Sequence, residues 1–293
     1  MTASLKVRAH AKVNLGLQIL GRRPDGFHEV ISVMQAISLH DVITFNEADG
    51  LEVESGVEGL DVREDLIWRA ANALREAAGV RRGAAVKVEK NIPARAGLGG
   101  GSSDGAATLL ALNELWGCGM APEKLAAIAA TLGSDMGFFL AGGTALAQGR
   151  GEVVTPIPPA PQRWVLLAMP ERSLSTPAVY AELRPSEHSD GAATRALADG
   201  IERGELPYSH MRNDLAGPAR RLCPEISALL ESFAAQGSQT AMVSGSGSAC
   251  FGLFAERGAA LDCERALGEC SAWTRICQFE GAWGPGAPWD RIP

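Results

Sequence analysis

The first stretch of the chain alternates hydrophobic and polar side chains with the period of a β-strand. Between Leu5 and Ile19 every odd position is aliphatic and most even positions are polar. Successive side chains of a strand point to opposite faces, so the pattern predicts a long strand with one buried and one exposed face. Lys12 and Asn14 fall on the polar face, about 7 Å apart. On this pattern alone, Lys12 is a solvated surface residue.

Turn residues and changes of periodicity divide the rest of the chain into shorter elements. The turn-forming residues 24–26 predict the start of a second strand at Phe27, running to Leu39. Thr176 and Pro177 predict the cap and first position of a helix. Further strands are predicted at 41–57, 84–90, 163–169, 239–243 and 273–279, and further helices at 65–78, 104–116, 123–132, 215–222, 224–235 and 256–267.

A proline-rich segment divides the chain into two parts. Prolines interrupt helices and strand ladders, and four of them fall between residues 149 and 161: Pro156, Pro158, Pro159 and Pro161. We therefore predict two domains, at residues 1–155 and 162–293. The tail from 284 to 290 is predicted to be a loop.

A glycine-rich loop joins the predicted strand 84–90 to the predicted helix 104–116. Four of the five residues from 97 to 101 are glycine, which permits positive φ and lets backbone N–H groups converge on an anion. Ser102 and Ser103 are suitable N-caps, and the helix dipole adds positive potential. The loop is therefore a candidate phosphate site. It matches neither the Walker A pattern nor the dinucleotide fingerprint, and composition alone also allows an ordinary flexible loop.

Composition limits the classes of function. The 293 residues are 46% hydrophobic and 21% charged, which is typical of a globular protein, and the net charge of −7 argues against a broad basic surface for nucleic acid or anionic lipid. Six cysteines without Cys-x-x-Cys spacing make a zinc site unexpected. The first residues lack a signal-peptide pattern and no run of 18 apolar residues occurs, so we expect a soluble, cytoplasmic protein that binds neither nucleic acid nor membrane.

The order of residues in the glycine loop is more specific than its composition. Pro93, Gly97-Leu98-Gly99 and Ser102-Ser103 stand at the spacing found in the phosphate loop of the galactokinase, homoserine kinase, mevalonate kinase and phosphomevalonate kinase superfamily, which this segment resembles. The resemblance implies that the loop binds ATP through Pro93, Ala94, Arg95, Ala96, Gly97, Leu98, Gly99, Gly100, Gly101, Ser102 and Ser103.

Three further segments resemble one branch of this superfamily, the 4-diphosphocytidyl-2-C-methyl-D-erythritol kinases. They are Ala11 to Leu15 followed by 23–28, Gly133 to Phe139, and 175–180. The glycine turn at 244–251 is similar to the superfamily's third motif, which lies near the phosphate loop. The resemblance implies an α+β fold with an N-terminal domain like the second domain of ribosomal protein S5, a C-terminal ferredoxin-like domain and an active site in the cleft between them.

The same resemblance implies the residues of the acceptor site. Phe27 and Tyr180 would stack on the two sides of cytosine, and His28 would bind its polar edge. Phe27 stands where the family often has tyrosine, and Met136-Gly137 replaces the family's Val-Pro after Asp135. The implied contacts to substrate are Lys12, Asn14, Phe27, His28, Lys90, Asp135, Thr176, Pro177 and Tyr180. From the residues alone, Asp135 is equally a helix cap and Tyr180 a packing residue.

The activity implied is ATP-dependent phosphorylation of the C2 hydroxyl of the methylerythritol unit, in the non-mevalonate route to isoprenoid precursors. Lys12 and Asp135 would form a catalytic pair, and which of them is the base stays open. Mg²⁺ would bridge the β- and γ-phosphates; Ser103 is a candidate ligand and no carboxylate pair stands out. The oligomeric state, monomer or homodimer, also stays open.

Two alternatives remain at this point. A sibling kinase for mevalonate or homoserine would keep the ATP loop without the aromatic residues at 27 and 180. A nucleic-acid-binding protein, suggested by the ribosomal-like domain alone, is disfavoured by the acidic balance and by the presence of Lys12 and Asp135.

Overall fold

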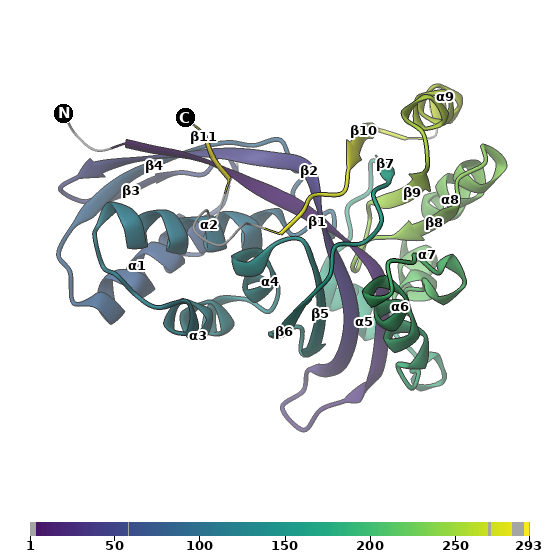
Figure 1. Ribbon diagram of the computed structural model, residues 1–293, viewed down its shortest axis with the longest axis horizontal. Helices are drawn as coiled ribbons and strands as arrows, with labels where there is room; N and C mark the ends of the chain where they lie inside the picture. Colours follow the sequence, from purple (N-terminus) through teal and green to yellow (C-terminus); the bar gives the residue numbers. More distant parts are fainter. Residues whose placement is uncertain (1–3, 58, 269–270, 283–289, 293) are drawn as a thin grey trace.

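One long antiparallel pair of strands runs through the molecule, as the computed structural model shows for residues 4–57, 59–268, 271–282 and 290–292 (Figure 1). β1 (Ser4–Arg22) pairs with β2 (His28–Ala48) along its whole length. The second strand is therefore longer than predicted, and the predicted strand 41–57 is the end of β2 followed by β3 (Leu51–Glu54).

The N-terminal half is a seven-stranded sheet with helices packed against it (Figure 1). The sheet has the order β11-β1-β2-β4-β3, and β5 pairs with both β2 and β6. Phe45, Leu74 and Leu112 belong to the core between the sheet and the helices. The other elements are β4 (Gly83–Glu89), β5 (Thr144–Gly149), β6 (Val153–Ile157), β11 (Asp290–Ile292), α1 (Leu66–Ala78), α2 (Gly100–Leu115), α3 (Pro122–Leu132) and α4 (Met136–Ala141).

The C-terminal half is a four-stranded antiparallel sheet in the order β10-β7-β9-β8. One face packs Leu166 and Phe254 against the helices α8 and α9, and the other packs Leu167 and Phe251 against β1. Its elements are β7 (Trp164–Met169), α5 (Thr176–Glu182), η1 (Pro185–Glu187), α6 (Ala192–Glu202), η2 (Tyr208–His210), α7 (Ala216–Leu222), α8 (Glu225–Ala235), β8 (Thr240–Val243), β9 (Cys250–Phe254), α9 (Arg257–Leu267) and β10 (Trp273–Gln278).

The middle of β1 is buried on both faces, which corrects the prediction of a half-exposed strand. Val13 and Leu15 pack in the same core as Phe251 of the C-terminal sheet. On the opposite face, Lys12 and Asn14 are only 3% and 2% exposed. This face is covered because the segment after β4 lies against it: Lys12 Nζ donates to the Gly97 carbonyl at 2.9 Å, and a Cβ at Gly99 would stand 3.1 Å from Cγ of Lys12. The polar residues of β1 therefore point into the interior.

The region between the two halves differs from the prediction in detail. β6 runs through Pro156, which pairs with Ala145. The strand tolerates proline because β6 lies at the edge of the sheet, pairing with β5 alone among the described strands, so this proline interrupts no ladder. The proposed domain boundary stays a prediction. Most of the predicted C-terminal loop lies outside the described residues, and Asp290 already begins β11, which pairs with β1.

Candidate active site

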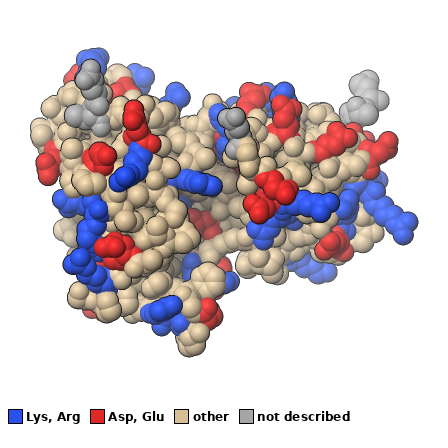
Figure 2. Space-filling model, turned by 180° about the vertical axis from the view of Figure 1, so that it is seen from behind, with Lys and Arg blue, Asp and Glu red and all other residues tan. Residues whose placement is uncertain are grey.

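A cavity of about 600 Å³ lies where the two halves meet. Its wall comes from β1 and β2, the segment that joins β3 to the start of α1, the segment after β4 with the glycine loop, and the turn before α4. The turn between β5 and β6, α5, the start of α7 and the loop after β8 complete it. Figure 2 shows basic and acidic side chains mixed over the face seen from behind, without a continuous basic surface there. Sixteen of the predicted site residues line the cavity: Lys12, Asn14, Lys90, Pro93, Ala94, Arg95, Ala96, Gly97, Leu98, Gly99, Gly100, Gly101, Ser102, Asp135, Thr176 and Tyr180.

The glycine loop leads directly into α2, which begins earlier than predicted. The helix starts at Gly100, and its N-cap is Gly99, with φ of 77° and no side-chain cap. Ser102 and Ser103 are therefore in the first turn and are not caps. Ser102 lines the cavity, whereas Ser103 is buried and lies outside the set of described residues that line it. The first-turn N–H groups and the positive end of the helix dipole face the cavity, as a phosphate site requires.

Positive φ occurs at only two of the four loop glycines, Gly97 and Gly99, and also at Arg95. Gly100 and Gly101 are helical, so the expected need for positive φ does not apply to them. At Gly97 a Cβ would stand 2.1 Å from the Ser244 carbonyl oxygen. At Gly99 it would stand 2.6 Å from Cζ of Phe139 and 3.1 Å from Cγ of Lys12. Close packing therefore requires glycine at both positions.

The third motif lies against this loop from the C-terminal half. The Ser244 hydroxyl donates to the Gly97 carbonyl at 3.0 Å, and the Ala249 N–H donates to the Ala96 carbonyl at 3.1 Å. Asn213 fixes the motif in turn, since its amide donates to the carbonyls of Val243 and Gly245, both at 2.8 Å. These hydrogen bonds join the two halves of the molecule directly at the candidate phosphate site.

Lys12 and Asp135 meet at the centre of the cavity. Lys12 Nζ stands 3.7 Å from Asp135 Oδ2, and it donates to Asn14 Oδ1 at 2.6 Å and to the Gly97 carbonyl at 2.9 Å. Burial lowers the pKa of Lys12, and the Asp135 carboxylate opposes this shift. Asp135 stands at the N-cap of α4 without making a side-chain cap hydrogen bond. Its carboxylate is therefore available to a ligand.

Lys90 lies at the glycine-loop end of the cavity, in a buried ion cluster. Its ammonium contacts Asp41 Oδ2 at 2.5 Å and Asp104 Oδ2 at 2.8 Å. Burial raises the pKa of Asp104. Burial by itself would lower the pKa of Lys90, but the carboxylates of Asp41 and Asp104 outweigh it and the pKa of Lys90 is raised. Gly100 is adjacent, because a Cβ there would stand 3.6 Å from Lys90 Nζ. The cluster ties β2 and the residue after β4 to α2.

Aromatic side chains gather beside the cavity around Tyr180, which lines it. The ring of Tyr180 on α5 stands 5.0 Å from that of His28, and His188 stands edge-on to His28 at 6.1 Å. Burial, with smaller effects of His188 and Arg22, lowers the pKa of His28. Burial also raises the pKa of Tyr180. Burial therefore favours the uncharged forms of both His28 and Tyr180.

Four predicted site residues stand outside the set of described residues that line the cavity: Phe27, His28, Ser103 and Pro177. Phe27 is 53% exposed beside the cavity mouth, and the guanidinium of Arg150 lies 5.0 Å from its ring centre. Ser175, and not Thr176 as predicted, caps α5 by accepting from the Ala178 N–H at 3.2 Å. The Thr176 hydroxyl instead pairs with that of Ser246 at 2.8 Å, so it points at the third motif.

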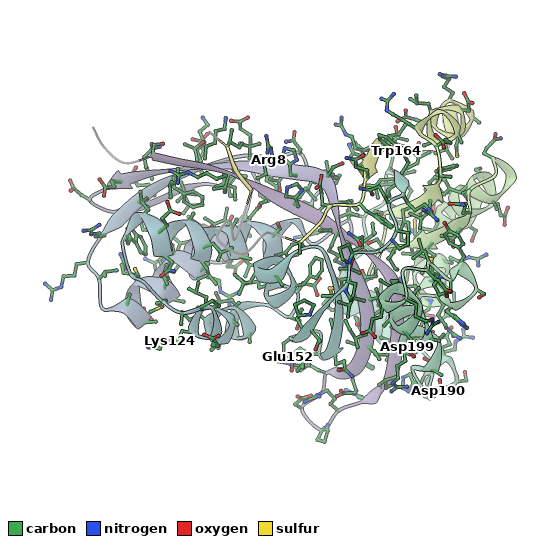
Figure 3. All side chains as sticks on the ribbon, in the orientation of Figure 1. Arg8, Lys124, Glu152, Trp164, Asp190 and Asp199 are labelled. Carbon is green, nitrogen blue, oxygen red and sulfur yellow. The ribbon has the colours of Figure 1, made fainter. Side chains whose placement is uncertain are left out.

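Sequence reasoning did not identify Arg150, His188 or Ser246 as site residues. Arg150 lies in the turn between β5 and β6, where its backbone N–H donates to Glu152 Oε2 at 2.5 Å; Figure 3 labels Glu152. A cation between Gly149 and Gly151 was the available signal, since flanking glycines mark a tight turn. The position of His188 carried no comparable signal in the sequence.

Metal ligands are sparse in the described part of the chain, which contains no group of three or more metal-binding side chains. The hydroxyl of Ser102, at the cavity wall beside the helix N-terminus, is a suitable oxygen donor. Mg²⁺ usually keeps several waters and takes most other ligands from substrate phosphates, so one hydroxyl fits its chemistry. Ser103, the ligand expected from the sequence, is buried away from the cavity.

Comparison with known protein families agrees with the fold. The model of the GHMP kinases N terminal domain matches residues 65–143, and that of the GHMP kinases C terminal domain matches 193–271. In the described residues, no helix is both long and apolar enough to span a membrane. The expected α+β fold with two kinase domains is confirmed.

Proteins named 4-diphosphocytidyl-2-C-methyl-D-erythritol kinase are similar over most of the chain. The one from Pelotomaculum thermopropionicum is 42% identical, covering 85% of this chain and 88% of the relative; that from Geobacter metallireducens is 40% identical, covering 92% and 96%. A crystal structure of 4-(cytidine 5'-diphospho)-2C-methyl-D-erythritol kinase has a TM-score of 0.82 and 37% identity, covering 94% of this chain and 100% of that one.

More distant structures share the fold alone. A homoserine kinase from Cytophaga hutchinsonii has a TM-score of 0.74 at 20% identity and covers 95% of both chains. A structure of L. major mevalonate kinase with R-mevalonate has a TM-score of 0.72 at 17% identity, covering 96% of this chain and 97% of that one. The proteins named 4-diphosphocytidyl-2-C-methyl-D-erythritol kinase are about twice as similar to this chain in sequence as these two structures are. The chain therefore belongs to the 4-diphosphocytidyl-2-C-methyl-D-erythritol kinase family of the GHMP kinases.

Proposed function

We propose that the protein transfers the γ-phosphoryl group of ATP to the C2 hydroxyl of 4-diphosphocytidyl-2-C-methyl-D-erythritol, giving the 2-phosphate and ADP. This reaction belongs to the non-mevalonate route to isoprenoid precursors. The observation that carries the proposal is the position of the Lys12–Asp135 pair, between a helix N-terminus at one end of the cavity and an aromatic group at the other.

At the glycine-loop end, the first N–H groups of α2 and its dipole bind the phosphates of ATP. They are rigid because Gly97 and Gly99 pack against the third motif and Phe139. Fixed donors of this kind stabilise developing negative charge without reorganising during the reaction. Mg²⁺, held by the phosphates, waters and the Ser102 hydroxyl, would neutralise part of the phosphate charge.

In the centre, Asp135 acts as the base. As the C2 hydroxyl oxygen bonds to the γ-phosphorus, its proton passes to Asp135, and the bond from the γ-phosphorus to the bridging oxygen of ADP breaks. Lys12 is unsuited to accept this proton, because its ammonium already donates to Asn14 and Gly97 and faces the Asp135 carboxylate. It stabilises the negative charge that develops on the reacting oxygen.

At the other end, Tyr180 and His28 recognise the cytidine part of the acceptor, with Phe27 closing over the base from the cavity mouth. Aromatic stacking on a base contributes roughly 1–3 kcal/mol. Phe27 is exposed and next to Arg150, so a modest movement of the turn at 23–27 brings its ring over a bound base. Lys90 stands at the glycine-loop end, so it contacts ATP rather than the acceptor.

An assay of ADP release with a panel of acceptors tests the proposal. The cytidylyl ester of methylerythritol should be phosphorylated, whereas free methylerythritol 4-phosphate, mevalonate and homoserine should not. Turnover of mevalonate or homoserine at a comparable rate would contradict the proposal in favour of a sibling kinase. The same proposal places the enzyme in the cytoplasm with small-molecule substrates, ATP and Mg²⁺, and without nucleic acid or membrane.

A further inference from the structure

One arginine outside the cavity binds both segments that carry the aromatic side chains. Arg221 on α7 donates from Nε to Glu182 Oε1 at 2.9 Å and from Nη2 to the Glu182 carbonyl at 2.8 Å. It also donates to both carboxylate oxygens of Glu187, at 2.7 and 2.9 Å. A single guanidinium thus joins the end of α5 to η1 through four hydrogen bonds. Planar, two-pronged contacts of this kind fix orientation as well as distance.

Glu182 and Glu187 are close in sequence to the two residues whose rings contact His28. Glu182 is two residues after Tyr180 on α5, and Glu187 directly precedes His188. Both Tyr180 and His188 contact the ring of His28. Arg221 itself is outside the set of described residues that line the cavity, so any effect it has on the acceptor must pass through these neighbours.

The far side of His188 is anchored separately. The backbone N–H of Ser189 donates to the Ile19 carbonyl at 2.9 Å, and its hydroxyl donates to Asp214 Oδ2 at 2.6 Å. His188 is therefore held between two fixed points, Glu187 and Ser189. Packing adds a constraint at α7, because a Cβ at Gly217 would stand 2.9 Å from Glu187 Oε1. A larger side chain at this position would crowd the carboxylate that binds Arg221.

We propose that Arg221 is a positioning residue for acceptor recognition: it fixes α5 and η1 so that Tyr180 and His188 hold His28 in the geometry that binds the cytosine. The inference rests on the proposed function of the aromatic end. By this inference α7 influences the KM for the acceptor, although none of its side chains takes part in the reaction.

The Arg221–Glu187 pair keeps its charges over the working range of pH. The Arg221 guanidinium lowers the pKa of Glu187 to about 2, so this carboxylate is ionised from mildly acidic to alkaline pH. The effect of removing Arg221 should therefore be nearly constant between pH 6 and 9. Substitution of His28, whose pKa burial lowers, should by contrast have an effect that changes with pH.

The test compares KM values in Arg221→Gln and wild type. We expect the KM for the cytidylyl acceptor to rise about tenfold, the size of effect that misplacement of one stacking ring would give. The KM for ATP should stay within about twofold. Arg221→Lys should recover part of the loss, because a lysine ammonium can bind one of the two carboxylates but cannot make the planar, two-pronged contacts that join both. Arg265→Gln is the matched control, since Arg265 pairs with Asp262 on the exposed surface of α9.

A double mutant shows whether Arg221 acts through the ring. If it does, Arg221→Gln should change the acceptor KM little once Tyr180 is already alanine, so the two effects are not additive. Equal increases in both KM values, an unchanged acceptor KM, or full additivity would overturn the inference. If Arg221→Gln lowers Tm so far that it does not fold, Glu182→Ala removes the side-chain contact of Arg221 with α5 and is judged by the same KM criteria.

The controls separate this inference from the proposed function. Should Tyr180→Ala itself leave the acceptor KM unchanged, the aromatic end is not the cytidine site and the proposed function fails. Should Tyr180→Ala raise the acceptor KM while Arg221→Gln does not, the proposed function survives and only the role of Arg221 is refuted.

Discussion

The two ends of the cavity are built in different ways. At the glycine-loop end, the candidate phosphate site is one continuous segment, 93–102, whose donors are backbone N–H groups at the start of α2. The aromatic end is assembled from side chains of separate segments, with His28 on β2, Arg150 between β5 and β6, Tyr180 on α5 and His188 after η1. A phosphate site can therefore be encoded locally, whereas recognition of the acceptor depends on tertiary contacts between both halves.

Because the two ends differ, a substitution at one end should change the KM for one substrate only. A substitution in the Lys12–Asp135 pair should instead change kcat. Asp135→Asn should lower kcat at least ~10²-fold, the scale of general-base catalysis, while both substrates still bind. Steady-state kinetics with separate titration of ATP measures this. Asp199→Asn on α6, an exposed aspartate labelled in Figure 3, is the control and should behave as wild type. Near wild-type turnover of Asp135→Asn would remove Asp135 from the mechanism.

The next largest effect should be at the glycine loop. Gly99→Ala places a Cβ against Phe139 and Lys12 at a positive φ, so the KM for ATP should rise about tenfold or more. Gly101→Ala is the matched comparison, because this glycine is helical and the nearest atom to its Cβ would be 3.8 Å away. Its ATP KM should change clearly less. An equal effect of the two substitutions would mean that backbone conformation at Gly99 is not what the nucleotide requires.

At the aromatic end, His28→Ala should raise the acceptor KM several-fold and leave that for ATP unchanged. It should also reduce discrimination between the cytidylyl ester and its uridylyl analogue, since the base edge loses its hydrogen-bonding partner. Competition between the two esters measures the ratio directly. Unaltered discrimination would show that another group, such as Arg150, distinguishes the bases.

The smallest effect concerns pH. Burial, His188 and Arg22 lower the pKa of His28, so the acceptor KM should stay flat as pH falls past 6.5 and rise only when His28 is finally protonated. His188→Asn removes one cause of the lowered pKa, so that rise should begin at a higher pH, with a change of less than about twofold at pH 7. Profiles of acceptor KM between pH 5 and 8 check the direction. A shift towards lower pH would contradict the assignment.

The sequence predicted the local features of this molecule better than those set by packing. Most helices and strands agree within a few residues, because their caps and periodicity are local: Asp65 and Gly79, for example, bound α1 as expected. The predicted start of α2 was wrong, because Ser102 and Ser103 lie inside the helix but have the same capping propensity as serines at a true N-cap. The choice between Ser175 and Thr176 failed for the same reason.

Lys12 shows what periodicity cannot supply. Its place on the polar face of a strand indicated exposure, yet the segment after β4 and the third motif cover that face and bury it. Only the resemblance to a kinase family singled it out together with Asp135. His188 and Arg221 carried no signal at all, because their roles arise from contacts between elements far apart in the chain.

The central claim is that nucleotide and acceptor are recognised at opposite ends of one cavity, and the two KM values of Tyr180→Ala test it most directly. The account predicts that the KM for the cytidylyl acceptor rises by about one to two powers of ten, the loss of one stacking ring, while the KM for ATP stays within about twofold of wild type. An unchanged acceptor KM, or a parallel rise in the KM for ATP, would contradict it.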